Sequence, residues 1–110
     1  MLWRVVCLAE AELERSALPK TGIATMINAD AKLRSLGPSL GCPHSSDVRG
    51  EVGLNEFRPR GGRGPWRAFY RQIRAEFVAA AVGPEAQVDP QGFRRACQAA
   101  VQRLAEVEEG

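Results

Sequence analysis

The sequence has few of the residues that build metal sites and disulfide frameworks. It contains a single histidine and three cysteines, Cys7, Cys42 and Cys97, and no two of the cysteines have C-x-x-C spacing. A zinc site takes several nitrogen and sulfur ligands, so neither a metal nor another cofactor is expected. Each cysteine stands among apolar or small residues, which favours free thiols in a reducing compartment. No phosphate-loop, H-E-x-x-H or G-x-S-x-G motif is present, so these enzyme classes are excluded.

Long apolar runs are also missing. No segment approaches the length needed to cross a bilayer, so no membrane partner is predicted. The apolar start, Met1–Leu8, is too short for a signal sequence and acidic residues follow it at once. We therefore expect a cytoplasmic protein. Its 110 residues, 45% hydrophobic and 25% charged, fit one globular domain over residues 1–110.

Acidic residues are absent from one long stretch, although the net charge is only +2. Between residues 58 and 74 the sequence has neither an acid nor a lysine. The charged residues there are Arg58, Arg60, Arg63, Arg67, Arg71 and Arg74. A basic patch suits an anionic partner, and guanidinium groups suit phosphates and bases. The alternative is the solvated face of an ordinary sheet.

The first half of the chain predicts a strand, two helices and a loop. Leu2–Leu8 is β-branched and apolar on both faces, which is typical of a central strand. Ala9–Leu18 and Thr21–Leu36 are rich in helix formers or have apolar residues at helical spacing, which indicates a helical hairpin. Gly37–Gly53 is rich in glycine, proline and serine and is expected to be a loop, and His44 lies in it.

The second half predicts three strands and a helix. The strands are Leu54–Arg58, Trp66–Ile73 and Phe77–Val82, and their short links require antiparallel pairing. Asp89–Pro90 indicates a helix start. The following apolar stripe contacts either the core or a partner protein. The fold class is therefore α+β, with a helical hairpin packed on a twisted, mostly antiparallel sheet. The order is strand–helix–helix–strand–strand–strand, then a C-terminal helix.

Strand alternation selects two of the arginines. Arg58 lies on one face of its strand and Arg67 on one face of the next, so the two can converge if the strand register allows it, whereas Tyr70 lies on the other face of its strand. Paired guanidinium groups could bind phosphates and stabilise charge that develops on one of them. His44 and Tyr70 are the candidates for proton transfer. Each has a simpler explanation, His44 as a surface or capping residue and Tyr70 as a core residue.

Several segments in this order resemble the RelE/HigB superfamily of type II toxin–antitoxin toxins. They are WRVVCL (Trp3–Leu8), LPK (Leu18–Lys20), KLRSLG (Lys32–Gly37), LNEFRPR (Leu54–Arg60), WRAFYR (Trp66–Arg71) and FVAAAVG (Phe77–Gly83). The resemblance implies a RelE-like fold and a ribosome-dependent mRNA endonuclease (an mRNA interferase) that inhibits translation. It also implies ribosome and mRNA as partners, and silencing by a cognate antitoxin of helix-turn-helix type.

The resemblance also assigns candidate site residues. Arg58, Arg67 and Tyr70 match a basic residue, an arginine and a tyrosine of the family's catalytic strands, and His44 is added as a candidate catalytic residue. Arg60, Arg63, Arg71 and Arg74 are the candidate RNA-binding residues. Two further basic positions of the family fall on Glu56 and on Pro84–Glu85, and its C-terminal tyrosine falls near Gln91 or Phe93.

Two alternatives follow from these departures. A ParE-type toxin has the same fold and acts on DNA gyrase without nuclease residues. A degenerate toxin survives as an antitoxin-bound corepressor. In both, the arginines need not support cleavage.

Overall fold

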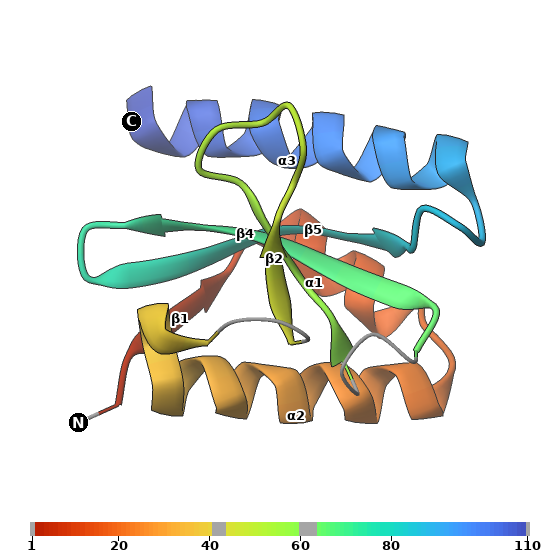
Figure 1. Cartoon of the computed structure of the whole chain (residues 1–110), viewed down its shortest axis with the longest axis horizontal. Coiled ribbons are helices and arrows are strands. Elements are labelled where there is room, and N and C mark those ends of the chain that lie inside the picture. The colour runs from red at the N-terminus through yellow and green to blue at the C-terminus, as the bar shows by residue number, and fades with distance from the viewer. Residues whose placement is uncertain (1, 41–43, 60–63, 110) are drawn as a thin grey trace.

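The fold is a five-stranded sheet with helices on both faces (Figure 1). The computed structural model describes residues 2–40, 44–59 and 64–109. The strand order is β1-β5-β4-β3-β2, and the predicted α+β class is confirmed. The elements are β1 (Arg4–Cys7), α1 (Ala9–Ser16), α2 (Lys20–Leu36), the 3-10 turn η1 (Gly37–Ser39), β2 (Ser45–Asp47), β3 (Asn55–Phe57), β4 (Trp66–Ile73), β5 (Glu76–Pro84) and α3 (Pro90–Glu109).

The β4–β5 hairpin forms the centre of the sheet. It is antiparallel from Trp66 opposite Pro84 to Ile73 opposite Glu76, with a register shift at Phe69/Tyr70. The bounds of both strands are close to the predicted ones, because the apolar residues of these segments are buried within the sheet. Phe69, Ala80 and Ala81 are fully buried. The predicted short turn is confirmed, and Arg74 adopts a left-handed backbone there, with φ 58°.

The prediction of a central first strand was wrong. β1 lies at the edge of the sheet and pairs only with β5, in parallel. Its residues are apolar on both faces because helices cover both faces of the sheet up to this edge. Trp3 and Val5 pack into the cluster under α2, and Leu8 packs into the cluster under α3. Apolar residues on both faces of this strand therefore indicate that helices cover both faces of the sheet, and do not indicate a neighbouring strand on each side.

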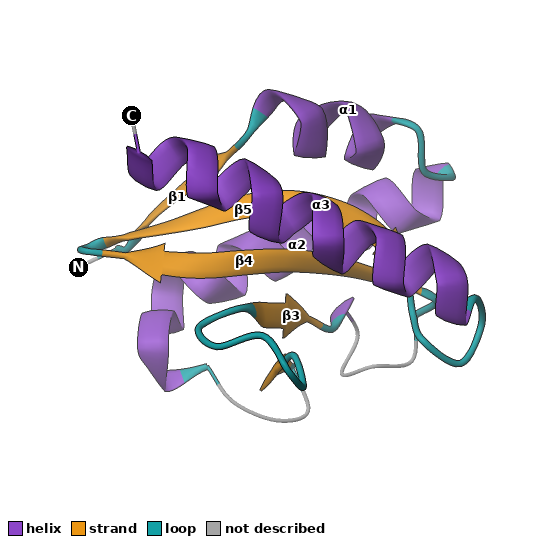
Figure 2. Cartoon of the chain, turned by 90° about the horizontal axis from the view of Figure 1, so that it is seen from above, coloured by secondary structure: helices purple, strands orange, loops and turns teal. Residues whose placement is uncertain are grey.

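Helix α1 continues along β5 where β1 ends (Figure 2). The Val82 N–H donates to Glu14 Oε1 at 3.1 Å, and Arg103 Nη1 donates to the Ala80 carbonyl at 2.9 Å. Glu14 and Arg103 also pair with each other through both carboxylate oxygens. These side chains satisfy backbone groups that a further strand would otherwise pair, and so they close this edge of the sheet.

The predicted loop Gly37–Gly53 contains structure that the sequence did not indicate. η1 follows α2, and β2 pairs antiparallel with β3, with Ser45 opposite Phe57. β2 has three residues, all polar, so it shows no apolar alternation. It becomes a strand because β3 offers its free edge. The sheet consequently has one strand more than predicted.

Helices α2 and α3 cover opposite faces of the sheet (Figures 1 and 2). The predicted stripe of α3 is confirmed as core-facing, because Cys97, Ala100 and Leu104 are buried against β4 and β5. The predicted start is confirmed too, since Asp89 Oδ1 accepts the Gly92 N–H at 2.9 Å. A Cβ at Gly83 would lie 2.6 Å from the Ala96 Cβ, so this glycine allows α3 to approach β5. Of the helices in the described ranges, none is both long and apolar enough to cross a membrane.

Removal of the Glu14 carboxylate should open the β5 edge. In a Glu14→Ala variant the Val82 N–H loses its acceptor and Arg103 loses its ion-pair partner. We expect the free energy of unfolding to fall by about 1–3 kcal/mol, measured by urea denaturation. Glu12→Ala removes an exposed carboxylate from the same helix and serves as the control. Equal effects of the two substitutions would contradict the role given to Glu14.

The buried thiol of Cys97 should make stability fall at alkaline pH. Burial, assisted by the negative charges of Glu56 and Glu51, raises the pKa of Cys97 from 9.0 to about 11. The folded state therefore holds this proton more tightly than the unfolded chain, so stability is lost as the pH rises from 9 towards 11. Between pH 8 and 11, wild type should lose roughly 2 kcal/mol more than Cys97→Ala. Parallel pH profiles would contradict this account.

Candidate functional site

Arg58 and Arg67 meet in one open cavity on the face that α3 covers. Glu56 is opposite Phe69 in the β3–β4 register, which places position 58 across from position 67. The convergence expected from strand alternation is therefore present. The cavity has a volume of about 330 Å³, and Glu56, Glu85 and Phe93 also line it. The site is built by the ends of β3 and β5, the start of β4 and the first turns of α3.

Glu56 binds Arg58 in this cavity. One carboxylate oxygen, Oε1, accepts from Arg58 Nε at 2.9 Å and Nη2 at 2.7 Å. The same oxygen accepts the Ser46 hydroxyl at 3.2 Å, so β2 also contributes. The side chain of Glu56 is 9% exposed and that of Arg58 is 37% exposed. The carboxylate is thus held in place, while the guanidinium reaches the surface.

Arg67 is more deeply buried than Arg58. Its side chain is 5% exposed, and Nη2 donates to Glu85 Oε2 at 2.8 Å. Nη1 donates to the carbonyls of Gly64 and Trp66 at 2.7 and 3.0 Å. Burial lowers the pKa of Arg67, and the carboxylates of Glu56 and Glu85 oppose this shift. The guanidinium remains charged at neutral pH, because an arginine side chain does not lose its proton in proteins.

The two arginines are therefore each paired with a carboxylate. The two pairs, Glu56–Arg58 and Arg67–Glu85, have no net formal charge. The acids stand at the positions where the family resemblance places basic residues. A cavity of this kind holds both carboxylates and guanidinium groups. A carboxylate can accept a proton, and a guanidinium can stabilise negative charge beside it. Sequence reasoning noted both acids as departures but did not predict that they bind these arginines.

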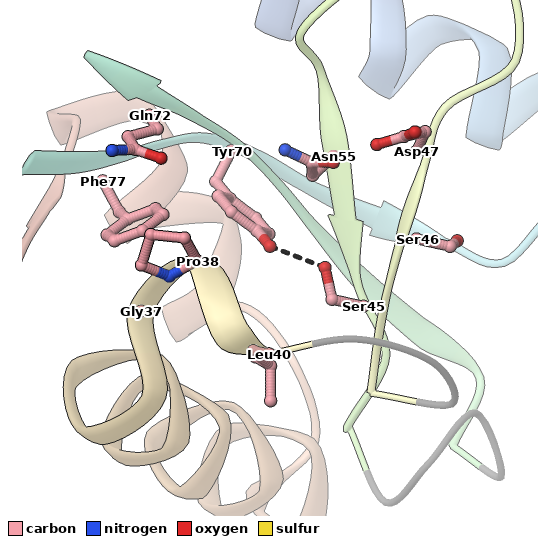
Figure 3. Close-up of a pocket in the computed structure, with 10 residues that line it drawn as sticks. All are labelled: Gly37, Pro38, Leu40, Ser45, Ser46, Asp47, Asn55, Tyr70, Gln72 and Phe77. Carbon is pink, nitrogen blue, oxygen red and sulfur yellow. Dashed lines mark hydrogen bonds between the residues drawn. The ribbon is translucent and has the colours of Figure 1, made fainter. Parts of the chain in front are cut away.

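Tyr70 lies on the opposite face of the sheet from Arg58 and Arg67. Its hydroxyl is 2.6 Å from Ser45 Oγ, and both residues are 5% exposed (Figure 3). Burial raises the pKa of Tyr70, and the hydrogen bond to Ser45 partly offsets this. The pair borders a cavity of about 400 Å³ that also involves Pro38 and Phe77. The structure therefore does not bring Tyr70 together with the two arginines.

His44 directly precedes β2 and does not line the cavity of Arg58 and Arg67. Its carbonyl accepts the Arg58 N–H at 2.8 Å, which extends the β2–β3 ladder by one pair. Its ring lines a third cavity, of about 390 Å³, between α2 and the end of β3. Arg58 lines this cavity as well as the Arg67 cavity, so it links the two faces.

Of the remaining predicted RNA-binding arginines, the two that the structure describes, Arg71 and Arg74, do not line the cavity of Arg58 and Arg67. Arg71 donates to Glu108 Oε1 on α3 and to the Val52 carbonyl. Arg74 is exposed in the β4–β5 turn, roughly 20 Å along the strand from Arg67. Arg60 and Arg63 lie outside the described residues. In the part of the chain that is described, no group of three or more histidine, cysteine, aspartate and glutamate side chains could hold a metal ion.

Breaking the Arg67–Glu85 pair should destabilise the fold. In Glu85→Ala, a guanidinium that is 5% exposed loses its charged partner but keeps its carbonyl acceptors. We expect the free energy of unfolding to fall by about 2 kcal/mol, measured by urea denaturation. The control is Glu51→Ala, which removes an exposed carboxylate from a loop. A variant as stable as the control would show that the pair contributes nothing to stability.

The fold has known counterparts among toxins. A double arginine-to-alanine mutant of the Escherichia coli toxin RelE in the free state matches with a TM-score of 0.68 and 16% identity. That match covers 94% of this chain and 98% of RelE. The toxin–antitoxin complex RelBE2 from Mycobacterium tuberculosis matches with a TM-score of 0.60 and 19% identity, over 77% of this chain and 100% of that one. No protein-family model and no curated protein sequence matches. The predicted RelE-like fold is confirmed.

Proposed function

We propose that this chain is the toxin component of a type II toxin–antitoxin system and an mRNA endonuclease that acts on the ribosome. Its partners are then the ribosome, mRNA and a cognate antitoxin, expected to be of helix-turn-helix type, in the cytoplasm. The RelE-like fold supports this proposal. The observation that carries it is the convergence of Arg58 and Arg67 with Glu56 in one open cavity.

In this mechanism the nucleophile belongs to the RNA. The ribose 2′-oxygen attacks the adjacent phosphorus, and the bond from phosphorus to the 5′-oxygen breaks. Glu56 takes the proton of the 2′-hydroxyl, and water supplies a proton to the leaving 5′-oxygen. Arg58 and Arg67 stabilise the charge that develops on the phosphorane. A positioned base contributes about 10²–10⁴-fold to such a reaction. The products are a 2′,3′-cyclic phosphate and a 5′-hydroxyl.

A second candidate function is binding without cleavage. It is favoured by the ion pairs, because each arginine already has a carboxylate partner in the free protein. RNA would have to compete with Glu56 for Arg58 and with Glu85 for Arg67. A ParE-type action on gyrase needs no such exchange. Neither does a corepressor that acts only in complex with its antitoxin.

Transcript mapping on translating ribosomes separates the first candidate from the others. The wild-type chain should create new 5′-hydroxyl ends. Glu56→Gln should lower the cleavage rate by about 100-fold or more, because the amide cannot accept the proton. Arg58→Ala should also lower the rate. Arg34→Ala removes an exposed arginine on α2, away from the cavity, and should cleave at the wild-type rate.

Other outcomes select between the alternatives. Inhibition of DNA supercoiling by gyrase without RNA cleavage would favour the ParE-type action. Operator binding by the antitoxin complex, with no cleavage and no effect on growth, would favour the corepressor. Cleavage that is unchanged in Glu56→Gln would contradict the assignment of Glu56 as the base.

A further inference from the structure

The cavity between α2 and the end of β3 contains one cation, Lys32, that no carboxylate balances. Lys32, His44 and Arg58 line it, together with Asn28 and Thr25. No carboxylate lines it among the described residues, and Lys32 forms no ion pair with any of them. The Arg67 cavity differs, because two acids balance its two arginines. The excess positive charge therefore lies on the α2 side of Arg58 and favours an anion there.

The donors of this cavity come from two rigid elements. Thr25, Asn28 and Lys32 follow each other at spacings of three and four residues, so α2 presents them on one side. His44 and Arg58 are fixed to each other by the backbone hydrogen bond at the ends of β2 and β3. The cavity is thus shaped by secondary structure and is present before any ligand arrives.

Lys32, His44 and Arg58 each keep hydrogen-bond capacity for a ligand. Lys32 Nζ lies 3.5 Å from His44 Nδ1. An ammonium has only donors, so this contact favours the tautomer with its proton on Nε2 and leaves the imidazole able to donate. Arg58 uses Nε and Nη2 for Glu56, while Nη1 has no partner in the described part of the chain. The Asn28 side chain likewise has no partner there.

We propose that this cavity binds a backbone phosphate of single-stranded RNA, held by Lys32, His44 and Arg58. The inference rests on the proposed action on RNA and adds a second contact site to it. A volume of about 390 Å³ has room for a nucleotide unit. Because Arg58 lines both cavities, an RNA strand seated here would pass over Arg58 into the Arg67 cavity. His44 then binds RNA and takes no part in the chemistry.

Lys32→Ala tests the site, with Lys20→Ala as a matched control. These are the only two lysines in the sequence, and both are exposed on α2. They are separated by roughly 18 Å along the helix. The probe is a fluorescent single-stranded oligoribonucleotide with 2′-O-methyl riboses, which cannot be cleaved because the nucleophile is blocked. Binding is measured by anisotropy over a range of salt concentrations.

We expect Lys32→Ala to weaken binding about five- to tenfold at low salt. It should also reduce the slope of log K against log salt by about 0.7, the value for one phosphate contact on a single strand. His44→Ala should weaken binding as well, and Lys20→Ala should match wild type. Equal affinities and slopes for Lys32→Ala and Lys20→Ala would overturn the proposal, and so would an absence of RNA binding by wild type.

Inorganic phosphate distinguishes the two sources of the ligand. Added at constant ionic strength, it should displace the oligonucleotide only weakly, because the site uses the strand as well as the phosphate. Binding of free phosphate without binding of RNA would overturn the assignment to RNA. The outcome is separate from the nuclease proposal. If RNA binding depends on Lys32 but no cleavage occurs on ribosomes, the phosphate site is supported and the nuclease proposal is contradicted.

Discussion

The pairing of β5 on both of its sides is the constraint on which the rest of the structure depends. Along one side β5 bonds to β4, and along the other to β1 and then to α1. The Glu14–Arg103 pair completes the second side by satisfying Val82 and Ala80. With its edges satisfied and helices on both faces, β5 is the most enclosed element. Glu85 follows directly after it and therefore has a fixed position beside Arg67.

This enclosure explains why charge is distributed so differently on the two faces. On the α3 face, Arg67 is buried and needs a carboxylate partner, which Glu85 provides. A buried charge without such a partner is costly, so the pairing stabilises the fold there. On the α2 face Lys32 is exposed to water and needs no acid. The neutral and the positive cavity meet at Arg58, the residue that both share.

The parts of the fold with strong local signals were predictable. Helix α3 has a capping aspartate and a continuous apolar stripe. Both features depend on residues that are only a few positions apart in the sequence. The same holds for β4 and β5, whose turn at Arg74 joins adjacent segments. The edge position of β1 and the existence of β2 were missed. Both depend on which strand is available as a neighbour, and that neighbour is distant in sequence.

For the site, the sequence by itself determined that Arg67 and Tyr70 lie on opposite faces of one strand. Alternation along a strand is a local property, whereas the meeting of Arg58 with Arg67 also depends on the register of β3 against β4. Only the tertiary structure decided that Glu56 and Glu85 bind these arginines and that His44 faces Lys32. The physical reason is that an ion pair or cavity depends on distances in space. Arg67 and Glu85 are separated by 18 residues of sequence and come together only when β4 and β5 pair.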